Sequence, residues 1–190
     1  MDSDNLQFAF IGNNAAVDFI NTEIMMHGKL VDLLQENIDL VQWTQAAGFQ
    51  MTSRLNTGDL LAAKGLRQAL KDVCLAWINR RPARRQALAM INQHLANHAT
   101  HMALQARKND YVLVPDKGAD SFNVLLANLA YEGARLLASP QAARIKRCGN
   151  TECVLIFVDT SRGQKRIWCS MDTCGNRAKV AKHYRSHLSQ

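Results

Sequence analysis

The sequence has 190 residues, a formal net charge of +7 and 47% hydrophobic residues. This length allows one ordinary domain and a small additional module, with enough apolar residues for a packed core. No apolar run is long enough to span a bilayer, and the acidic start of the chain lacks the basic and apolar regions of a signal peptide. We therefore expect a cytoplasmic protein without a membrane partner, in which paired cysteines bind metal rather than form disulfides.

The positive charge is concentrated in one part of the chain. Residues 1–140 contain 13 Lys or Arg and 13 Asp or Glu, which cancel. Residues 141–190 contain 10 Lys or Arg but only three Asp or Glu. A neutral domain followed by a basic one is the charge distribution expected of a nucleic-acid-binding protein.

The first part of the chain is predicted to be mainly helical. Apolar spacing of three and four residues indicates helices, and short β-rich runs separated by polar turns indicate hairpins. The predicted elements in chain order are a short strand at 6–11, a helix from Ala15 carrying Val17, Ile20 and Ile24, a helical stretch at 31–48, helices at 60–79 and 84–99, a hairpin pairing 102–105 with 111–114, a long helix capped by Ser121, and a short helix starting at Ser139 and Pro140.

Four of the five cysteines form two evenly spaced pairs. Cys148 and Cys153 are five apart, as are Cys169 and Cys174, and a hairpin-length segment separates the pairs. Four thiolates at this spacing can enclose one tetrahedral Zn²⁺ and leave no position for water, which predicts a single structural zinc. A redox pair or incidental thiols are the plain alternatives.

A second ligand set is also available, because two histidines are four apart near the end of the chain. In that variant His183 and His187 would replace the first cysteine pair.

Gly149 and Gly175 follow ligands directly, where tight turns can aim backbone N–H groups at sulfur. A module this small needs the metal, because zinc binding supplies roughly 10–16 kcal/mol of folding free energy in finger peptides.

The order of elements in this module is knuckle, hairpin, knuckle and helix. The predicted hairpin pairs 154–159 with 167–169, and a helix follows Cys174. This layout resembles a treble-clef finger. The predicted fold class is therefore mainly α, with a helical N-terminal domain that contains a small β-hairpin (1–143) and a treble-clef-like zinc finger (144–190) packed on it.

The second knuckle carries a recognisable motif. Residues 168–177 read WCSMDTCGNR, and with Cys148, Cys153 and the run at 157–159 they resemble the CGNR zinc finger. Upstream, VDFINT at 17–22 and VLVP at 112–115 are similar to segments of the companion domain of that family, called ABATE. The resemblance implies a bacterial, stress-linked transcription regulator whose zinc finger binds DNA.

Basic side chains of the module are the candidate nucleic-acid contacts. They are Arg162, Lys165, Arg166, Arg177, Lys179, Lys182 and Arg185. We expect the last helix to approach the nucleic acid while the tip at 162–166 grips phosphates, and Val180, Tyr184 and Leu188 to pack on the hairpin. Five phosphate contacts predict a log–log salt slope of about −4 to −5, from about −0.9 per contact. A solvated basic face is the alternative, and Arg177 can instead brace the finger by bonding a backbone carbonyl.

Asp18, Asn21 and Thr22 form a polar cluster beside an apolar helix face. They can line a pocket for a small-molecule effector, as a sensory domain needs, or form a buried hydrogen-bond network. The leading interpretation is a zinc-dependent DNA-binding regulator with a sensing or assembling N-terminal domain. An RNA-binding module and a protein-interaction adaptor are the alternatives. An enzyme is not expected, because four cysteines close the zinc shell and the hairpin offers no histidine general base.

Overall fold

The computed structural model describes residues 8–49, 51, 54–96, 102–107, 110–115 and 121–188, and the molecule is mainly α-helical, as predicted. No helix in these ranges is long and apolar enough to cross a membrane. The elements are α1 (Ala15–Ile20), β1 (Glu23–Met26), β2 (Lys29–Asp32), α2 (Asn37–Ala46), α3 (Thr57–Ile78), α4 (Arg85–Ala96), β3 (Met102–Arg107), β4 (Asp110–Pro115), α5 (Ser121–Leu137), the 3₁₀ turn η1 (Pro140–Arg144), β5 (Ile145–Arg147), β6 (Ile156–Val158), the π-helical turn η2 (Met171–Gly175) and α6 (Asn176–Leu188).

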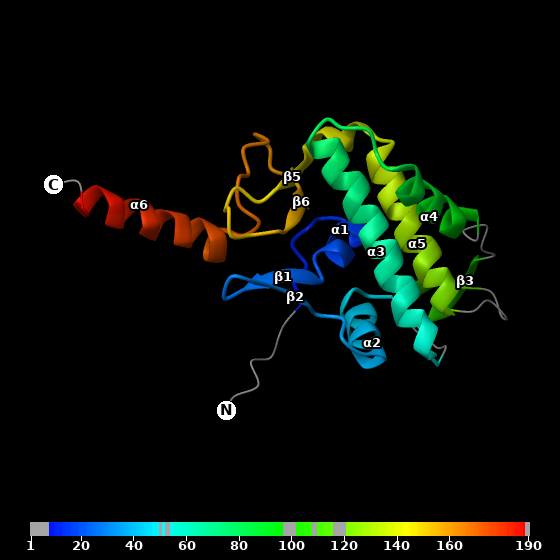
Figure 1. The fold of residues 1–190 in the computed structure, drawn as a ribbon. Helices are drawn as coiled ribbons and strands as arrows, with labels where there is room; N and C mark the ends of the chain where they lie inside the picture. The colour runs from blue at the N-terminus through cyan, green and yellow to red at the C-terminus, as the bar shows by residue number, and fades with distance from the viewer. Residues whose placement is uncertain are drawn as a thin grey trace, which may run out of the picture.

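Three long helices form the body of the molecule. Helices α3, α4 and α5 lie side by side, and the short α1 packs against α3 and α5 (Figure 1). Phe19, Leu66, Leu70 and Leu129 are completely or almost completely buried where these helices meet. The predicted helix at 60–79 is confirmed as α3, whose first turn is capped by the side chain of Asn56.

Residues 23–32 form a hairpin where helix was predicted. His27 and Gly28 both have positive φ angles, +48° and +75°, so the chain reverses in a two-residue turn between β1 and β2. Such a turn matches the twist of paired strands. The predicted helix from Ala15 therefore ends at Ile20, and Ile24 lies in a strand instead. The stretch predicted as helix at 31–48 begins as β2, and its helical part is α2 alone.

Most of the remaining elements are confirmed. The predicted helix at 84–99 is α4, and residues 97–99 lie outside the described ranges. Strands β3 and β4 form the predicted hairpin, and Ser139 caps the turn that starts at Pro140. The strand predicted at 6–11 is absent over residues 8–11, which make no strand pairing; residues 6 and 7 are not described.

The hairpin of the C-terminal module pairs different strands from those predicted. Strand β6 is antiparallel to β5, with Ile145 opposite Val158 and Arg147 opposite Ile156. The first cysteine knuckle is thus the turn of this hairpin. Residues 167–169 are not a strand, although the Ile167 carbonyl accepts a hydrogen bond of 2.9 Å from the Gly149 N–H. The partner strand of β6 therefore lies before the first knuckle, whereas it was predicted after β6, at residues 167–169.

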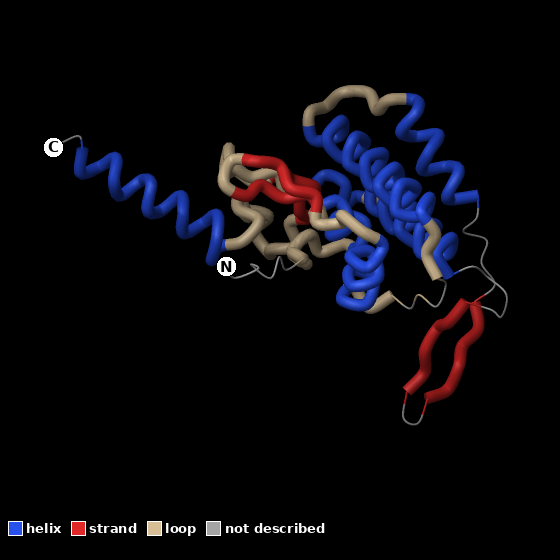
Figure 2. The backbone as a smooth tube through the Cα atoms, turned by 60° about the horizontal axis from the view of Figure 1, so that its bottom comes forward, coloured by secondary structure: helices blue, strands red, loops and turns tan. Residues whose placement is uncertain are grey.

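Two elements stand away from the body. Helix α6 projects from one end, and the β3–β4 hairpin extends from the other (Figure 2). Val180 and Tyr184 of α6 are 54% and 67% exposed, so the prediction that they pack on the finger hairpin is wrong. Leu188 belongs to α6, but its side chain is not described.

Candidate functional site

The four cysteines of the two knuckles meet at one point. Their sulfur atoms all lie within 4.8 Å of one another, and all four side chains are buried. The Sγ atom of Cys169 is 3.8 Å from that of Cys153 and 3.5 Å from that of Cys174. A tetrahedron with Zn–S bonds of about 2.3 Å has sulfurs about 3.8 Å apart. The spacing and chemistry of the donors therefore fit zinc.

Backbone and amide N–H groups point at these sulfur atoms. The Cys169 N–H lies 3.4 Å from the Cys148 sulfur, and the Asn150 side-chain amide lies 3.6 Å from the Cys174 sulfur. The Asn150 and Leu155 N–H groups bond the sulfurs of Cys148 and Cys153, each two residues earlier in the chain. Hydrogen bonds from neighbouring groups, chiefly the Cys169 side chain, outweigh burial and lower the pKa of Cys153. The backbone and amide N–H donors disperse the charge of the thiolates that bind metal.

The two knuckle glycines serve close packing. Their own N–H groups donate to the carbonyls of Ile167 and Ser170, while at the first knuckle the N–H of Asn150, directly after Gly149, bonds the Cys148 sulfur, as expected for a tight turn there. A Cβ atom at Gly149 would lie 2.6 Å from Ile167 Cγ2, and one at Gly175 would lie 2.9 Å from Met171 Sδ. At Gly149 the first knuckle therefore approaches the segment around Ile167 too closely for a larger residue, whereas at Gly175 the close neighbour is the flexible Met171 side chain of the same turn.

Arg166 braces the finger from inside. Its Nη2 atom donates to the Ile11 carbonyl at 3.0 Å and to the Cys169 carbonyl, and its Nε donates to the Trp168 carbonyl at 3.0 Å. The guanidinium carbon lies 4.1 Å from the centre of the Phe157 ring. With its Nε and Nη2 atoms bound to backbone carbonyls and its side chain half-buried, Arg166 is less available to a phosphate than its exposed neighbours Arg162 and Lys165.

A buried carboxylate shapes the loop that carries these cations. Asp159 is fully buried and forms an ion pair of 2.7 Å with Lys146 Nζ. The Ser161 hydroxyl and the backbone N–H groups of Ser161 and Arg166 also donate to it. The hydrogen bond from Lys146, followed by those from Ser161 and Arg166, holds the pKa of Asp159 well below its usual range. Asp159 therefore stays ionised and fixes both ends of loop 160–166.

Asn21 joins the helical body to the finger. Its side-chain amide donates to the Ile156 carbonyl at 2.9 Å and accepts from the Ile156 N–H at 3.0 Å. Nearby, the Val158 N–H donates to the Gly12 carbonyl at 2.9 Å. On this edge no strand of the described residues pairs with β6, and Asn21 and Gly12 satisfy its backbone instead. The finger is thereby held against α1.

The predicted ligand-pocket residues have three different sets of partners. Asp18 accepts a hydrogen bond of 2.7 Å from the Gly12 N–H, Asn21 binds Ile156, and the Thr22 hydroxyl donates to the Phe19 carbonyl at 2.8 Å. Asn21 and Thr22 are each only 1% exposed. Burial raises the pKa of Asp18 to about 6, although hydrogen bonds from Gly12 and Ile11 oppose the shift. The three residues lie on or directly after α1, and the polar groups of their side chains form hydrogen bonds with the protein's own backbone.

A buried ionic network anchors the β1–β2 hairpin to α3, and the sequence alone did not indicate it. Arg67 is 3% exposed and donates to Asp32 at 2.6 and 2.8 Å and to Thr22 at 2.9 Å, while Lys71 pairs with Glu23 at 2.6 Å. Burial raises the pKa of Asp32, but hydrogen bonds chiefly from Arg67 outweigh it and lower the pKa to about 2. The available signal was Arg67 itself, which directly follows the core residue Leu66.

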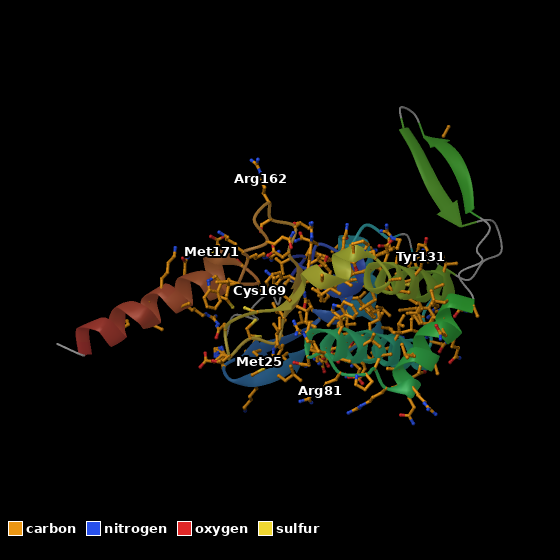
Figure 3. The ribbon with its side chains drawn as sticks, turned by 90° about the horizontal axis from the view of Figure 1, so that it is seen from above. Met25, Arg81, Tyr131, Arg162, Cys169 and Met171 are labelled. Atoms are coloured by element: carbon orange, nitrogen blue, oxygen red, sulfur yellow. The ribbon has the colours of Figure 1, made fainter. Side chains whose placement is uncertain are left out.

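The remaining predicted cations lie on the surface of the finger and on α6. Arg162, Lys165, Arg177 and Lys179 are exposed. Arg162 points away from the body at the edge of the molecule (Figure 3). Arg177 makes no side-chain hydrogen bond to the described residues, so the bracing bond considered for it is not seen. Lys182 and Arg185 lie on α6, but their side chains are not described.

Fold and site together define a zinc finger docked on a helical bundle. The CGNR zinc finger family matches residues 144–187. The ABATE family, whose description is "Putative stress-induced transcription regulator", matches residues 13–140. This second match covers more than half of the chain, so the protein belongs to the ABATE family, in agreement with the resemblance seen in its sequence. A search of curated proteins finds no match. The four cysteines thus form the site of one structural zinc ion.

Proposed function

We propose that this ABATE-family regulator is a zinc-dependent DNA-binding protein in which α6 enters the major groove. The observation that carries the proposal is the position of α6: it projects from the body and carries Arg177, Lys179, Lys182 and Arg185 without one Asp or Glu (Figure 1). A helix of this length extends about 20 Å at about 1.5 Å per residue. The major groove of B-DNA is wide enough to admit a helix.

The two sides of α6 differ in chemistry. Lys179, Lys182 and Arg185 follow one another at three-residue steps and share a side, while Val180 and Tyr184 lie four apart on another. The basic side is suited to phosphates and to the base edges of guanine. Arg162 and Lys165, on the loop fixed by Asp159, supply further cations. Arg166 is removed from the proposed contact set because its guanidinium braces the finger.

The proposed division of labour follows residues 1–143 and 144–190. The second unit binds DNA, and the first senses an effector or mediates assembly. The bonds from Asn21 to Ile156 and from Gly12 to Val158 support a fixed relation between the two units. A change in the helical body would therefore reach the finger without a flexible linker. RNA binding and an acidic protein partner remain the competing functions.

The test measures binding of the zinc-loaded full chain to a pool of random-sequence DNA duplexes by fluorescence anisotropy. The variant Lys179→Gln/Lys182→Gln/Arg185→Gln removes three charges from α6, and Arg54→Gln/Arg84→Gln/Arg85→Gln removes three exposed charges from the helical body. We expect the α6 variant to bind about tenfold or more weakly and the control to change much less. Equal losses would reject a specific role for α6. Tighter binding to RNA of matched sequence, or no binding to either polymer at low salt, would favour the competing functions.

A further inference from the structure

A cleft lies where the helical body meets the finger. Trp77, Arg80 and Arg81, from the end of α3 and the turn after it, form one wall. Ile145 and Arg147 of β5, with Ile167, form the other. The cleft has a volume of about 910 Å³. This volume falls within the range of small-molecule sites, which often form between two structural units.

The ionisable residues that line the cleft in the described part of the chain are all cations. Two of the five, Lys146 and Arg166, are bound to Asp159 and to backbone carbonyls. The other three, Arg80, Arg81 and Arg147, are exposed and make no side-chain hydrogen bond or ion pair with the described residues. Three exposed guanidinium groups around one hollow favour an anionic occupant.

Part of the lining of the cleft is apolar and aromatic. Trp77 and Ile167 are 49% and 58% exposed, beside the buried Ile145. The Trp77 indole Nε1 donates to the Ala142 carbonyl at 2.7 Å, which fixes the orientation of the ring. A held indole face binds flat apolar groups by stacking. A bare inorganic anion would leave this surface in water.

The geometry points to a binding site for a small organic anion with a planar apolar body. The guanidinium groups of Arg80, Arg81 and Arg147 bind its carboxylate, sulfonate or phosphate, and Trp77 stacks on its ring. A DNA backbone fits less well, because it has no planar apolar group to cover the apolar part of the lining. Arg81 also projects from the side of the molecule opposite Arg162 (Figure 3).

The position of the cleft gives such a ligand contact with both units. Arg147 and Gly149 border the zinc ligand Cys148 on one wall, and Trp77 belongs to the bundle on the other. A ligand that binds only when the walls are together stabilises the docked arrangement of finger and bundle. This assignment differs from the pocket predicted around Asp18, Asn21 and Thr22, and it does not depend on DNA binding.

The test uses 1-anilinonaphthalene-8-sulfonate as the probe and N-phenyl-1-naphthylamine, which has the same rings without the sulfonate, as its neutral match. Fluorescence titration of the zinc-loaded full chain should show saturable binding of the sulfonate and about tenfold weaker binding of the amine. Arg81→Gln and Arg147→Gln should each weaken sulfonate binding about two- to fivefold, as expected for loss of an exposed charge contact. Arg85→Gln, an exposed cation outside the cleft, should change it less than about twofold.

Three results would overturn the proposal. Equal binding of the two probes would mean an apolar surface without anion recognition. Unchanged sulfonate binding in Arg81→Gln and Arg147→Gln would place the probe elsewhere. Weaker binding of DNA duplexes by these variants with unchanged sulfonate binding would make the cleft part of a nucleic-acid surface. Zinc content and circular dichroism of each variant show whether it is folded, and both substituted arginines are exposed.

Discussion

Asn21 takes the place of a partner strand beside β6. Its amide satisfies both the N–H and the carbonyl of Ile156, and all of these groups are buried. Asn21→Ala leaves two buried backbone groups without partners and should lower the free energy of unfolding by about 2–4 kcal/mol. Urea unfolding measures the loss. Asn37→Ala removes one exposed hydrogen bond to the Asn56 carbonyl and should cost about 1 kcal/mol or less. Equal effects of the two substitutions would contradict the role given to Asn21.

Asp18 makes stability depend on pH. Burial raises the pKa of its carboxyl to about 6 in the folded chain, against an ordinary value of 3.8. Because the folded state holds this proton more tightly, its contribution to stability is present below about pH 4 and is lost as pH rises through 6. Asp18→Asn should therefore gain stability relative to the wild type as pH rises from about 4 to 6, and the difference should stay level above that. Chemical unfolding at several pH values measures this difference, and a constant difference would refute the raised pKa.

Features that depend on residues close together in the sequence were predictable, and contacts between distant positions were not. The cysteines were predictable because metal ligands impose their own spacing, and α3 was predictable from its apolar stripe. The contacts of Asn21, Arg67 and Arg166 were not, because each joins positions far apart in the chain. Arg166 in particular cannot be distinguished by sequence from the surface cations near it, because its bonds to three carbonyls depend on the fold.

The predicted boundaries of helices and strands were wrong where a tight turn ends one element and begins the next. The apolar residues of 24–31 fit a helix as well as two short strands, and only the positive φ angles at His27 and Gly28 give a hairpin. The partner of β6 was missed because β5 is only three residues long and lies before the knuckle. Packing of Val180 and Tyr184 on the finger was expected from their helical spacing, but α6 leaves the body directly after η2.

Helix α6 should contribute little to the stability of the rest of the chain. Its described contacts are mainly with η2, and it follows the last zinc ligand, Cys174. A chain that ends at Arg177 should retain one zinc ion and unfold within about 0.5 kcal/mol of the full chain, as expected for surface changes away from packed features. Duplex binding should weaken at least as much as in the Lys179→Gln/Lys182→Gln/Arg185→Gln variant. Zinc quantification and urea unfolding test the first part, and loss of zinc from the shortened chain would show that α6 supports the metal site.

Body and finger share one core in the whole molecule. Ile145, Ile156 and Val158 of the finger hairpin belong to the same buried cluster as the helical bundle, while Phe157 packs with the four cysteines. Removing zinc should therefore destabilise the bundle as well as the finger. Thermal unfolding followed by far-UV circular dichroism, with and without a zinc chelator, should show a lower transition temperature for the helices. An unchanged helical transition would mean that the two parts fold independently.

In the function proposed here, a zinc-held finger presents the cations of α6 and loop 160–166 to duplex DNA. The most direct measurement is the salt dependence of duplex affinity for the zinc-loaded full chain. Six contacts, from Arg162, Lys165, Arg177, Lys179, Lys182 and Arg185, predict a log–log slope of about −5 at about −0.9 per contact. The Lys179→Gln/Lys182→Gln/Arg185→Gln variant should reduce it to about −2 to −3. A slope near zero would contradict binding of DNA phosphates by these cations, and the same slope in both proteins would contradict the role of α6.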